Sequence, residues 1–291
     1  MSTKAIAETI EGLLAGQGDP NRKSPLKNLG FLSCANTVHI KHVPFYDPCL
    51  ILVLSGSKVL YARGKPVRCP TGTLVAVPGP SSFDLRNEPD PKTKKYSALV
   101  IPFKAELLDR LARSHNLIHE VRPDPAGLLT FAPDETLYES IRHYLSTLGN
   151  VKLLNHRLME ILLILAARNP ELLSFCWHRH RWSERVRVLL STDLAHSWSI
   201  AEVSKRLATT ESTLRRNLKQ EGMSFRSLLQ ELRLASALMQ LLQTAQPIYL
   251  VAYNCGYKSV SRFTSTFHKR FGVLPKEFRA TAGADERHLT A

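Results

Sequence analysis

Three potential metal ligands, Cys176, His178 and His180, alternate near the middle of the chain. A structural zinc site needs four ligands, and these three lack a fourth. No Ser-His-Asp arrangement, glycine-rich phosphate loop or pair of carboxylates stands out elsewhere in the sequence. We therefore expect no catalysis, no metal and no cofactor, and we assign residues 177–182 to a basic linker.

The remaining chemically suggestive residues are basic. The chain carries 39 Lys plus Arg against 25 Asp plus Glu, which gives a formal net charge of +14 and a pI of about 9.7. A surplus of this size predicts an anionic partner, either nucleic acid or an acidic membrane surface. Residues 183–279 hold 15 basic against 7 acidic residues, so the net charge is about twice as dense there as in residues 1–182.

Length and composition restrict the class of protein. The chain has 291 residues with 44% hydrophobic and 22% charged side chains, which is typical of about two globular domains. We expect no membrane span, because no run of 18 apolar residues occurs, and the Met1–Leu14 segment does not resemble a signal peptide. The five cysteines are scattered and odd in number, which favours a reducing, cytoplasmic location.

The elements that position the basic residues fall into two halves. Residues 30–103 contain short apolar or alternating runs between turn signals, which predicts a small antiparallel barrel or sandwich. Helical spacing follows over 104–115, 133–148 and 152–168. The last of these helices is apolar over so much of its surface that it needs either a second protomer or complete burial within its own domain.

From Ser183 onward the sequence carries a repeated helix-turn-helix pattern. Ser199 to Glu202 forms a predicted capping box, and the helix it opens turns at residues 208–210. The helix of residues 211–221 follows and ends at Gly222. The pattern of Ile200, Val203, Ser204 and Ala208 recurs 48 residues later as Ile248, Val251, Ala252 and Gly256, and Leu214 and Leu218 recur as Phe263 and Phe267.

A long helix over residues 224–244 connects the two copies. About 20 residues span roughly 30 Å, and successive major grooves on one side of B-DNA lie roughly 34 Å apart. Such a helix can hold two reading helices in adjacent turns of the duplex. Its inner stripe is predicted to comprise Phe225, Leu228, Leu229, Leu232, Ala235, Met239 and Leu242.

Residues 183–279 resemble the DNA-binding domain of the AraC/XylS family of bacterial transcription regulators. The most specific stretch reads Pro247-Ile248, Val251-Ala252, Gly256-Tyr257, Phe263, Phe267, Phe271-Gly272, Pro275 and Phe278-Arg279. In the connecting helix Arg233, Ala237, Leu241 and Leu242 match as well. The sequence departs from the family pattern at His268, where Lys or Arg is usual, and at Leu274, where Ser or Thr is usual.

The resemblance implies a sequence-specific regulator, expected to activate, whose two recognition helices enter the major groove. Arginine pairs bidentately with guanine, whereas phosphate contacts give affinity without sequence information. We expect bases to be read by Ser212, Arg215, Arg216, Ser261, Arg262 and Ser265. We expect phosphates to be contacted by Lys219, Lys258, His268, Lys269 and Arg270. The family also implies RNA polymerase as a partner.

The N-terminal half resembles the regulatory domain of the same family, a cupin-like barrel followed by dimerisation helices. The overall fold class is therefore α+β, with an all-α double helix-turn-helix domain at the C-terminus. The resemblance implies a homodimer, an effector site, or both, and candidate effector contacts are Lys58, Tyr61, Arg63 and Arg68. The alternatives are a packed barrel with exposed basic residues and control by a partner protein or none.

A metal-dependent cupin enzyme is a remote alternative. Such enzymes hold their ion with a His-x-His pair, a nearby Glu and a later His, whereas two residues separate His39 from His42 and the next Glu is Glu88. The expected domain boundaries are residues 1–29 for an N-terminal arm, 30–176 for the regulatory domain, 177–182 for the linker, 183–279 for the DNA-binding domain and 280–291 for a disordered tail.

Overall fold

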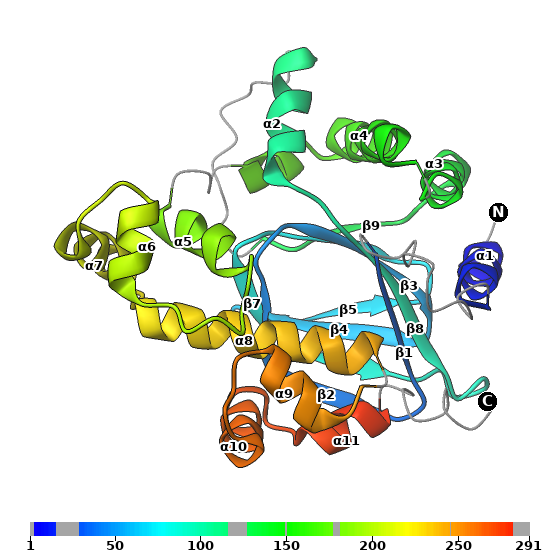
Figure 1. Cartoon of the computed structure of the whole chain (residues 1–291). Coiled ribbons are helices and arrows are strands. Elements are labelled where there is room, and N and C mark those ends of the chain that lie inside the picture. Colours follow the sequence, from blue (N-terminus) through cyan, green and yellow to red (C-terminus); the bar gives the residue numbers. More distant parts are fainter. Residues whose placement is uncertain are drawn as a thin grey trace. The chain divides into compact units, whose positions relative to one another are not determined.

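The computed structural model describes residues 3–15, 29–115, 127–148, 150–176, 181–244 and 246–281 (Figure 1). The chain divides into two compact units, Met1–Trp177 and His178–Ala291. Residues 177–180 of the expected linker, residues 16–28 of the expected arm and residues 282–291 of the expected tail lie outside the described residues. Within the described residues no helix is long and apolar enough to cross a membrane.

The strands of the first unit form two antiparallel sheets. The five-stranded sheet has the order β1–β8–β3–β6–β9, with bounds Gly30–Cys34, Tyr96–Pro102, Cys49–Ser55, Leu74–Val77 and Leu129–Phe131. The four-stranded sheet has the order β2–β7–β4–β5, with bounds Val38–Phe45, Ser81–Glu88, Ser57–Ala62 and Lys65–Pro70. The predicted cupin-like fold is thus present, as two hydrogen-bonded sheets and not as one closed barrel.

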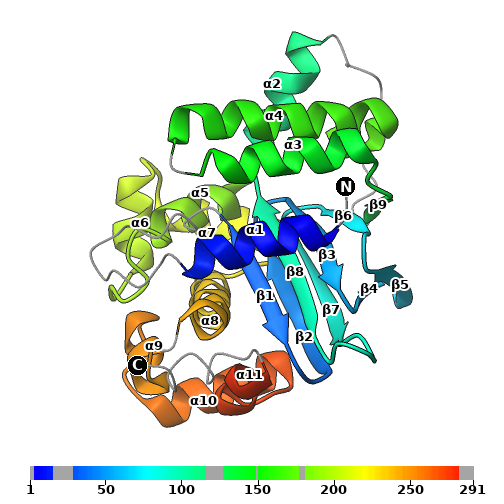
Figure 2. The ribbon, with the colours of Figure 1, turned by 90° about the vertical axis from the view of Figure 1, so that its right-hand side faces the viewer.

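Helices cover one face of the five-stranded sheet (Figure 2). They are α1 (Thr3–Ala15), α2 (Ala105–Ser114), α3 (Glu135–Ser146), α4 (Val151–Arg168) and the 3-10 helix η2 (Pro170–Cys176). Ile6 and Ile10 bury α1 in the core of this unit, so the expected N-terminal arm includes a packed helix. The packing gives the first unit a substantial apolar core.

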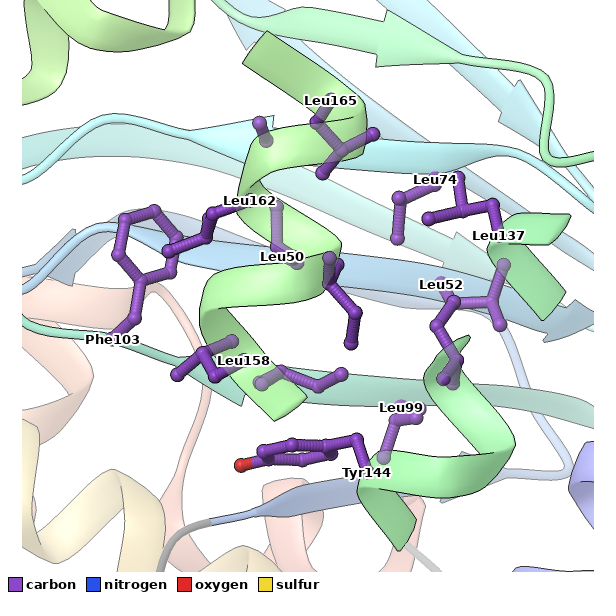
Figure 3. Packing of buried hydrophobic residues seen from close by; sticks show 14 of the residues in the cluster. Leu50, Leu52, Leu74, Leu99, Phe103, Leu137, Tyr144, Leu158, Leu162 and Leu165 are labelled. Carbon is purple, nitrogen blue, oxygen red and sulfur yellow. The ribbon is translucent and has the colours of Figure 1, made fainter. Parts of the chain in front are cut away.

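The core between sheet and helices explains the continuous apolar run in β3. Leu50 and Leu52 of β3 pack with Leu158 and Leu162 of α4 and with Leu137 of α3 (Figure 3). The alternate residues of the strand point to the opposite face of the sheet because side chains alternate along a strand. A strand buried on both faces has no polar positions, which is why residues 49–54 read as unbroken apolar sequence.

Three strands, β1, β5 and β9, have sequence patterns too weak to predict them as strands, and the reason can be given for each. In β5 the Cys69 side chain is the buried one, so this edge strand lacks the apolar alternation that marks a half-buried strand. β1 has buried residues at both ends and half-buried residues between them, and β9 has three residues. Each is held by backbone pairing with a better-marked neighbour, β8 for β1 and β6 for β9.

The described part of the second unit is helical, as expected. Its helices are α5 (Trp182–Leu190), α6 (Ile200–Arg206), α7 (Glu211–Gln220), α8 (Phe225–Gln243), α9 (Ile248–Asn254), α10 (Val260–Phe271) and α11 (Pro275–Thr281). In Figure 1, α8 runs from the α6–α7 pair to the α9–α10 pair. The connecting helix contacts α5, α9 and α11.

The inner stripe predicted for α8 is partly wrong. Leu228 and Leu232 are buried, but Met239 is 40% exposed, and Leu234, Leu238 and Leu241 are buried instead. The reason is that α8 packs against α5 on one side and against α9 and α11 on another. A helix with two sets of neighbours does not keep a single apolar face.

Candidate nucleic-acid interface

The first helix-turn-helix unit is α6, a tight turn and α7. Thr210 caps α7 by accepting a hydrogen bond from the Thr213 backbone at 3.2 Å, and Leu214 and Leu218 are completely buried. Ala208 in the turn has a φ of +51°, a left-handed conformation that is unfavourable for a residue with a Cβ. The sharp turn leaves the opposite face of α7 exposed.

The predicted capping box at the start of α6 forms only in one direction. The Ser199 hydroxyl accepts from the Glu202 backbone at 3.1 Å. The Glu202 carboxylate instead contacts His196 Nε2 and Arg206 Nη2, each at 2.9 Å. These two partners lower the pKa of Glu202, chiefly through the His196 hydrogen bond.

The second unit, α9 and α10, has an aromatic interior. Phe263, Phe267 and Phe271 are buried along one face of α10, with successive ring centroids 5.6 and 4.7 Å apart. Gly256 in the turn has a φ of +77°, and Ser259 caps α10 through the Arg262 backbone at 3.4 Å. The turn therefore repeats the geometry found at Ala208.

The predicted base-reading residues lie on the exposed faces of the two recognition helices, α7 and α10. All six are exposed: Ser212, Arg215, Arg216, Ser261, Arg262 and Ser265. Arg215 Nη2 lies 3.3 Å from Glu211 Oε2, with the Arg215 side chain 64% exposed. An exposed ion pair of this kind is weak enough to leave the guanidinium available for another acceptor.

The predicted phosphate contacts divide into two groups. Lys219, Lys258, His268 and Lys269 are exposed. Arg270 is largely buried, with its Nη2 3.2 Å from Glu231 Oε2 and its guanidinium carbon 5.7 Å from the centre of the Phe271 ring. Arg270 thereby ties α10 to α8, a role that its place in the sequence did not indicate.

The predicted effector contacts do not come together. The Lys58 side chain points into the interior of the sheet sandwich, where it is 1% exposed and donates to Asn87 Oδ1 at 2.7 Å. Arg68 and Tyr61 fall on the outer face of the same sheet, because their positions alternate with that of Lys58 through the strand register. Arg63 is exposed in the turn that follows β4.

The surroundings of Lys58 are unusual for a buried ammonium. Burial lowers the pKa of Lys58 to about 8, and three buried thiols, those of Cys34, Cys69 and Cys49, raise it slightly. The Lys58 Nζ lies 5.6 Å from the centre of the Tyr96 ring. The buried Tyr96 hydroxyl finds no hydrogen-bond partner among the described residues. Asn87 and Tyr96 carried no sequence signal, since Asn87 stands among the other polar residues of β7 and Tyr96 begins the apolar strand β8.

His42 and Glu88, which were weighed as ligands of a cupin-type metal site, have other partners. Among the described residues, no three His, Cys, Asp or Glu side chains gather as a metal site. His42 Nδ1 lies 3.3 Å from Asp84, and Glu88 is held by Arg68 and Arg86, each at 2.6 Å. His178, His180 and the Cys176 side chain lie outside the described residues.

Comparisons with known proteins agree with both halves of the chain. Residues 203–281 match the model of a helix-turn-helix domain, and residues 48–175 match that of the ExsA N-terminal regulatory domain. The urease operon transcriptional activator of Escherichia coli is 33% identical over 97 residues, which are 33% of each chain. The regulator GadX of Escherichia coli O6:H1 is 35% identical over 95 residues, 33% of this chain and 35% of GadX. The alignments thus span about a third of the length of these relatives.

Solved structures share the fold of most of this chain. ToxT from Vibrio cholerae strain SCE256, with an unsaturated fatty acid bound, superposes with a TM-score of 0.64 over 87% of this chain and 95% of ToxT, at 17% identity. ToxT from Vibrio cholerae O395 gives a TM-score of 0.61 over 88% of this chain and 98% of ToxT, at 16% identity. The chain thus carries an AraC-type helix-turn-helix domain and an ExsA-type regulatory domain, and the relatives it matches are regulators of the AraC/XylS family.

Proposed function

We propose that this protein is a sequence-specific DNA-binding transcription activator that reads two adjacent major grooves with α7 and α10. The observation that carries the proposal is the repeated pairing of a buried apolar face with an exposed face of arginine and serine on these two helices. Several relatives matched over the helix-turn-helix segment are named activators. RNA polymerase is the corresponding protein partner, and a homodimer is the proposed assembly.

Loss of a base contact and loss of a phosphate contact should have different effects on DNA binding. Arg262→Ala should relax specificity at one base pair, by about 1–3 kcal/mol, because a bidentate contact to guanine is lost. Lys269→Ala should weaken binding to every sequence alike, because a phosphate contact carries no base information. Duplexes selected by the full chain from a random pool, followed by a panel of single-base variants, test both. If both mutants lose the same affinity on every duplex of the panel, the assignment of Arg262 to base readout is refuted.

We further propose that a small anionic molecule controls the protein from the interior of the sheet sandwich. The support is Lys58, a buried ammonium that has no carboxylate partner among the described residues and lies 5.6 Å from the centre of the ring of Tyr96, whose hydroxyl is unsatisfied. A buried charge without a counter-ion is unfavourable, and an anionic group would compensate it. The fatty acid named with ToxT makes carboxylic acids the first class to screen.

A thermal-shift screen of carboxylic acids tests this role. A ligand of the folded state raises the melting temperature by mass action. The shift should vanish in Lys58→Met but persist in Lys65→Met, an exposed lysine of the neighbouring strand β5. The shift should also fade as pH rises through about 8, where Lys58 loses its proton. If no acid stabilises the chain, control by a partner protein replaces this proposal.

In α4 an exposed leucine, Leu153, supports a dimer through this helix. Leu162 is completely buried, and Leu163 and Ile164 pack against the core of their own unit. Leu153 is 47% exposed at the start of the helix. Sedimentation of the full chain tests the proposed homodimer, and Leu153→Glu should lower its association if α4 forms the interface.

A further inference from the structure

Arg233, in the middle of α8, joins parts of the second unit that are distant in sequence. Its Nε donates to the Leu194 carbonyl at 3.0 Å and its Nη2 donates to the His196 carbonyl at 2.9 Å. Both carbonyls belong to the loop between α5 and α6, which leads into the first helix-turn-helix unit. One guanidinium thus fixes this loop to the connecting helix through two hydrogen bonds.

The loop that presents these carbonyls is itself held in one conformation. Asp193 Oδ1 accepts from the backbones of Ala195 at 2.9 Å and His196 at 3.1 Å, and the Asp193 carbonyl accepts from Trp198 Nε1 at 2.6 Å. The His196 ring meets the Trp198 ring edge-on, with centroids 4.7 Å apart. Arg233 therefore contacts a rigid acceptor pair.

Gly256 brings the second helix-turn-helix unit to the same point. A Cβ placed on Gly256 would lie 2.4 Å from the Leu194 carbonyl oxygen and 2.6 Å from Arg233 Nη2. Contacts this short mean that the turn between α9 and α10 sits directly on the Arg233–Leu194 hydrogen bond. Three segments meet here, the loop that leads into the first helix-turn-helix unit, the turn of the second unit and α8, at a junction that we call the Arg233 junction.

Each recognition helix is anchored by one carboxylate to a helix that leads to this junction, α7 to α5 and α10 to α8. At the end of α7, Glu221 accepts from the backbones of Trp182 at 2.6 Å and Ser183 at 3.0 Å, which anchors α7 to the start of α5. Helix α10 is anchored to α8 by the Arg270–Glu231 pair, two residues before Arg233. A displacement at the junction would therefore move α7 relative to α10.

We infer that Arg233 is a positioning residue that sets the separation of the two recognition helices and thereby makes the protein selective for the spacing of its two half-sites on DNA. The inference rests on the proposed two-groove reading. A guanidinium holds its Nε and Nη2 donors in one rigid plane and so fixes the relative position of two carbonyls, whereas the three donors of an ammonium share one atom at the end of a flexible stem. Preorganisation of this kind favours one spacing because no ordering is needed on binding.

The test uses the full chain and its selected duplex. Failure of the chain to select any sequence would overturn the proposed function itself, before spacing is examined. Given a selected duplex, one base pair is inserted or removed between the half-sites, which rotates one half-site by roughly 35° relative to the other. The wild type should bind the altered duplexes about 30-fold more weakly, within the range of a base mismatch.

In Arg233→Met the affinity for the selected duplex should exceed the affinity for the altered duplexes by about threefold or less. The affinity for a duplex that carries one half-site should be unchanged. Arg226→Met, an exposed arginine on the same helix, is the matched control and should keep the wild-type ratio whatever affinity it loses. The inference is overturned if Arg233→Met retains the wild-type ratio, or if it loses one-half-site binding together with the ratio.

A milder variant guards against misfolding of Arg233→Met, which circular dichroism would reveal. Arg233→Lys keeps the charge but reaches one carbonyl, so its spacing ratio should lie between those of Arg233→Met and the wild type. A folded Arg233→Lys with an unchanged ratio overturns the inference as well.

Discussion

The two helix-turn-helix units share one apolar pattern but are held together by different interactions. The second unit has three phenylalanines whose rings meet tilted or edge-on, and the Phe267 ring centre also lies 6.1 Å from that of Phe278 in α11. The first has two leucines at the matching helix face, and its recognition helix is fixed at its end by the Glu221 carboxylate. The lesson is that a repeated pattern specifies a repeated shape, while the source of its stability differs between copies.

The largest effect is expected from the aromatic interior. Phe267→Ala should lower the free energy of unfolding of the second unit by about 3–5 kcal/mol, because a buried ring that contacts three others is replaced by a cavity. The matching change, Leu218→Ala, should cost about 2–3 kcal/mol, since Glu221 still anchors the helix. Urea unfolding followed by circular dichroism measures both, and equal losses would contradict the contrast.

The next largest effect is expected in the turns of the two helix-turn-helix units. Gly256→Ala should destabilise the fold by about 2–4 kcal/mol. The new Cβ would meet the Leu194 carbonyl, and the alanine backbone would have to keep a φ of +77°. Gly72→Ala, in the turn between β5 and β6 of the N-terminal unit, is the control, since Gly72 shares a positive φ but a Cβ there would meet only the Tyr138 hydroxyl at 3.6 Å. If Gly256→Ala lowers the free energy of unfolding no more than Gly72→Ala does, the close approach of Gly256 to the Leu194 carbonyl is unimportant for stability.

A smaller effect is expected from the polar anchor of the first unit. Glu221→Gln should cost about 1–2 kcal/mol, because charge-assisted bonds to the backbone at the start of α5 become neutral ones. Glu211→Gln on the same helix alters only an exposed pair with Arg215 and should cost less than about 0.5 kcal/mol. Thermal melts of both variants rank the two carboxylates, and a Glu211→Gln loss as large as that of Glu221→Gln would refute the ranking.

The smallest effect sharpens the comparison of the turns. Ala208 holds the conformation that glycine holds at the matching position 256, which is unfavourable by about 1–2 kcal/mol for an L-residue. Ala208→Gly removes this strain but gains chain entropy in the unfolded state, so a net stabilisation of about 0.5 kcal/mol is expected. A lower melting temperature for Ala208→Gly would show that the Ala208 methyl group makes favourable contacts that outweigh the strain.

Most of the helices and many of the strands followed from sequence pattern. The helix-turn-helix pairs α6–α7 and α9–α10 were predicted from the repeated pattern, because capping residues and buried apolar positions are local signals. The elements that were missed, such as β5 and β9, have weak patterns and are held by pairing with strands distant in sequence. The stripe of α8 was partly misassigned because its neighbours lie on two sides.

The sequence by itself determined which helices carry exposed arginine and serine, since the position opposite a buried leucine or phenylalanine is set by helical periodicity. Only the tertiary structure decided which basic side chains are engaged. Lys58 turns inward beside Asn87, Arg270 pairs with Glu231, and Arg233 binds two loop carbonyls. The physical reason is that the partner of a charged side chain comes from wherever the chain folds back upon it, and each of these partners stands 29 to 39 residues away along the sequence.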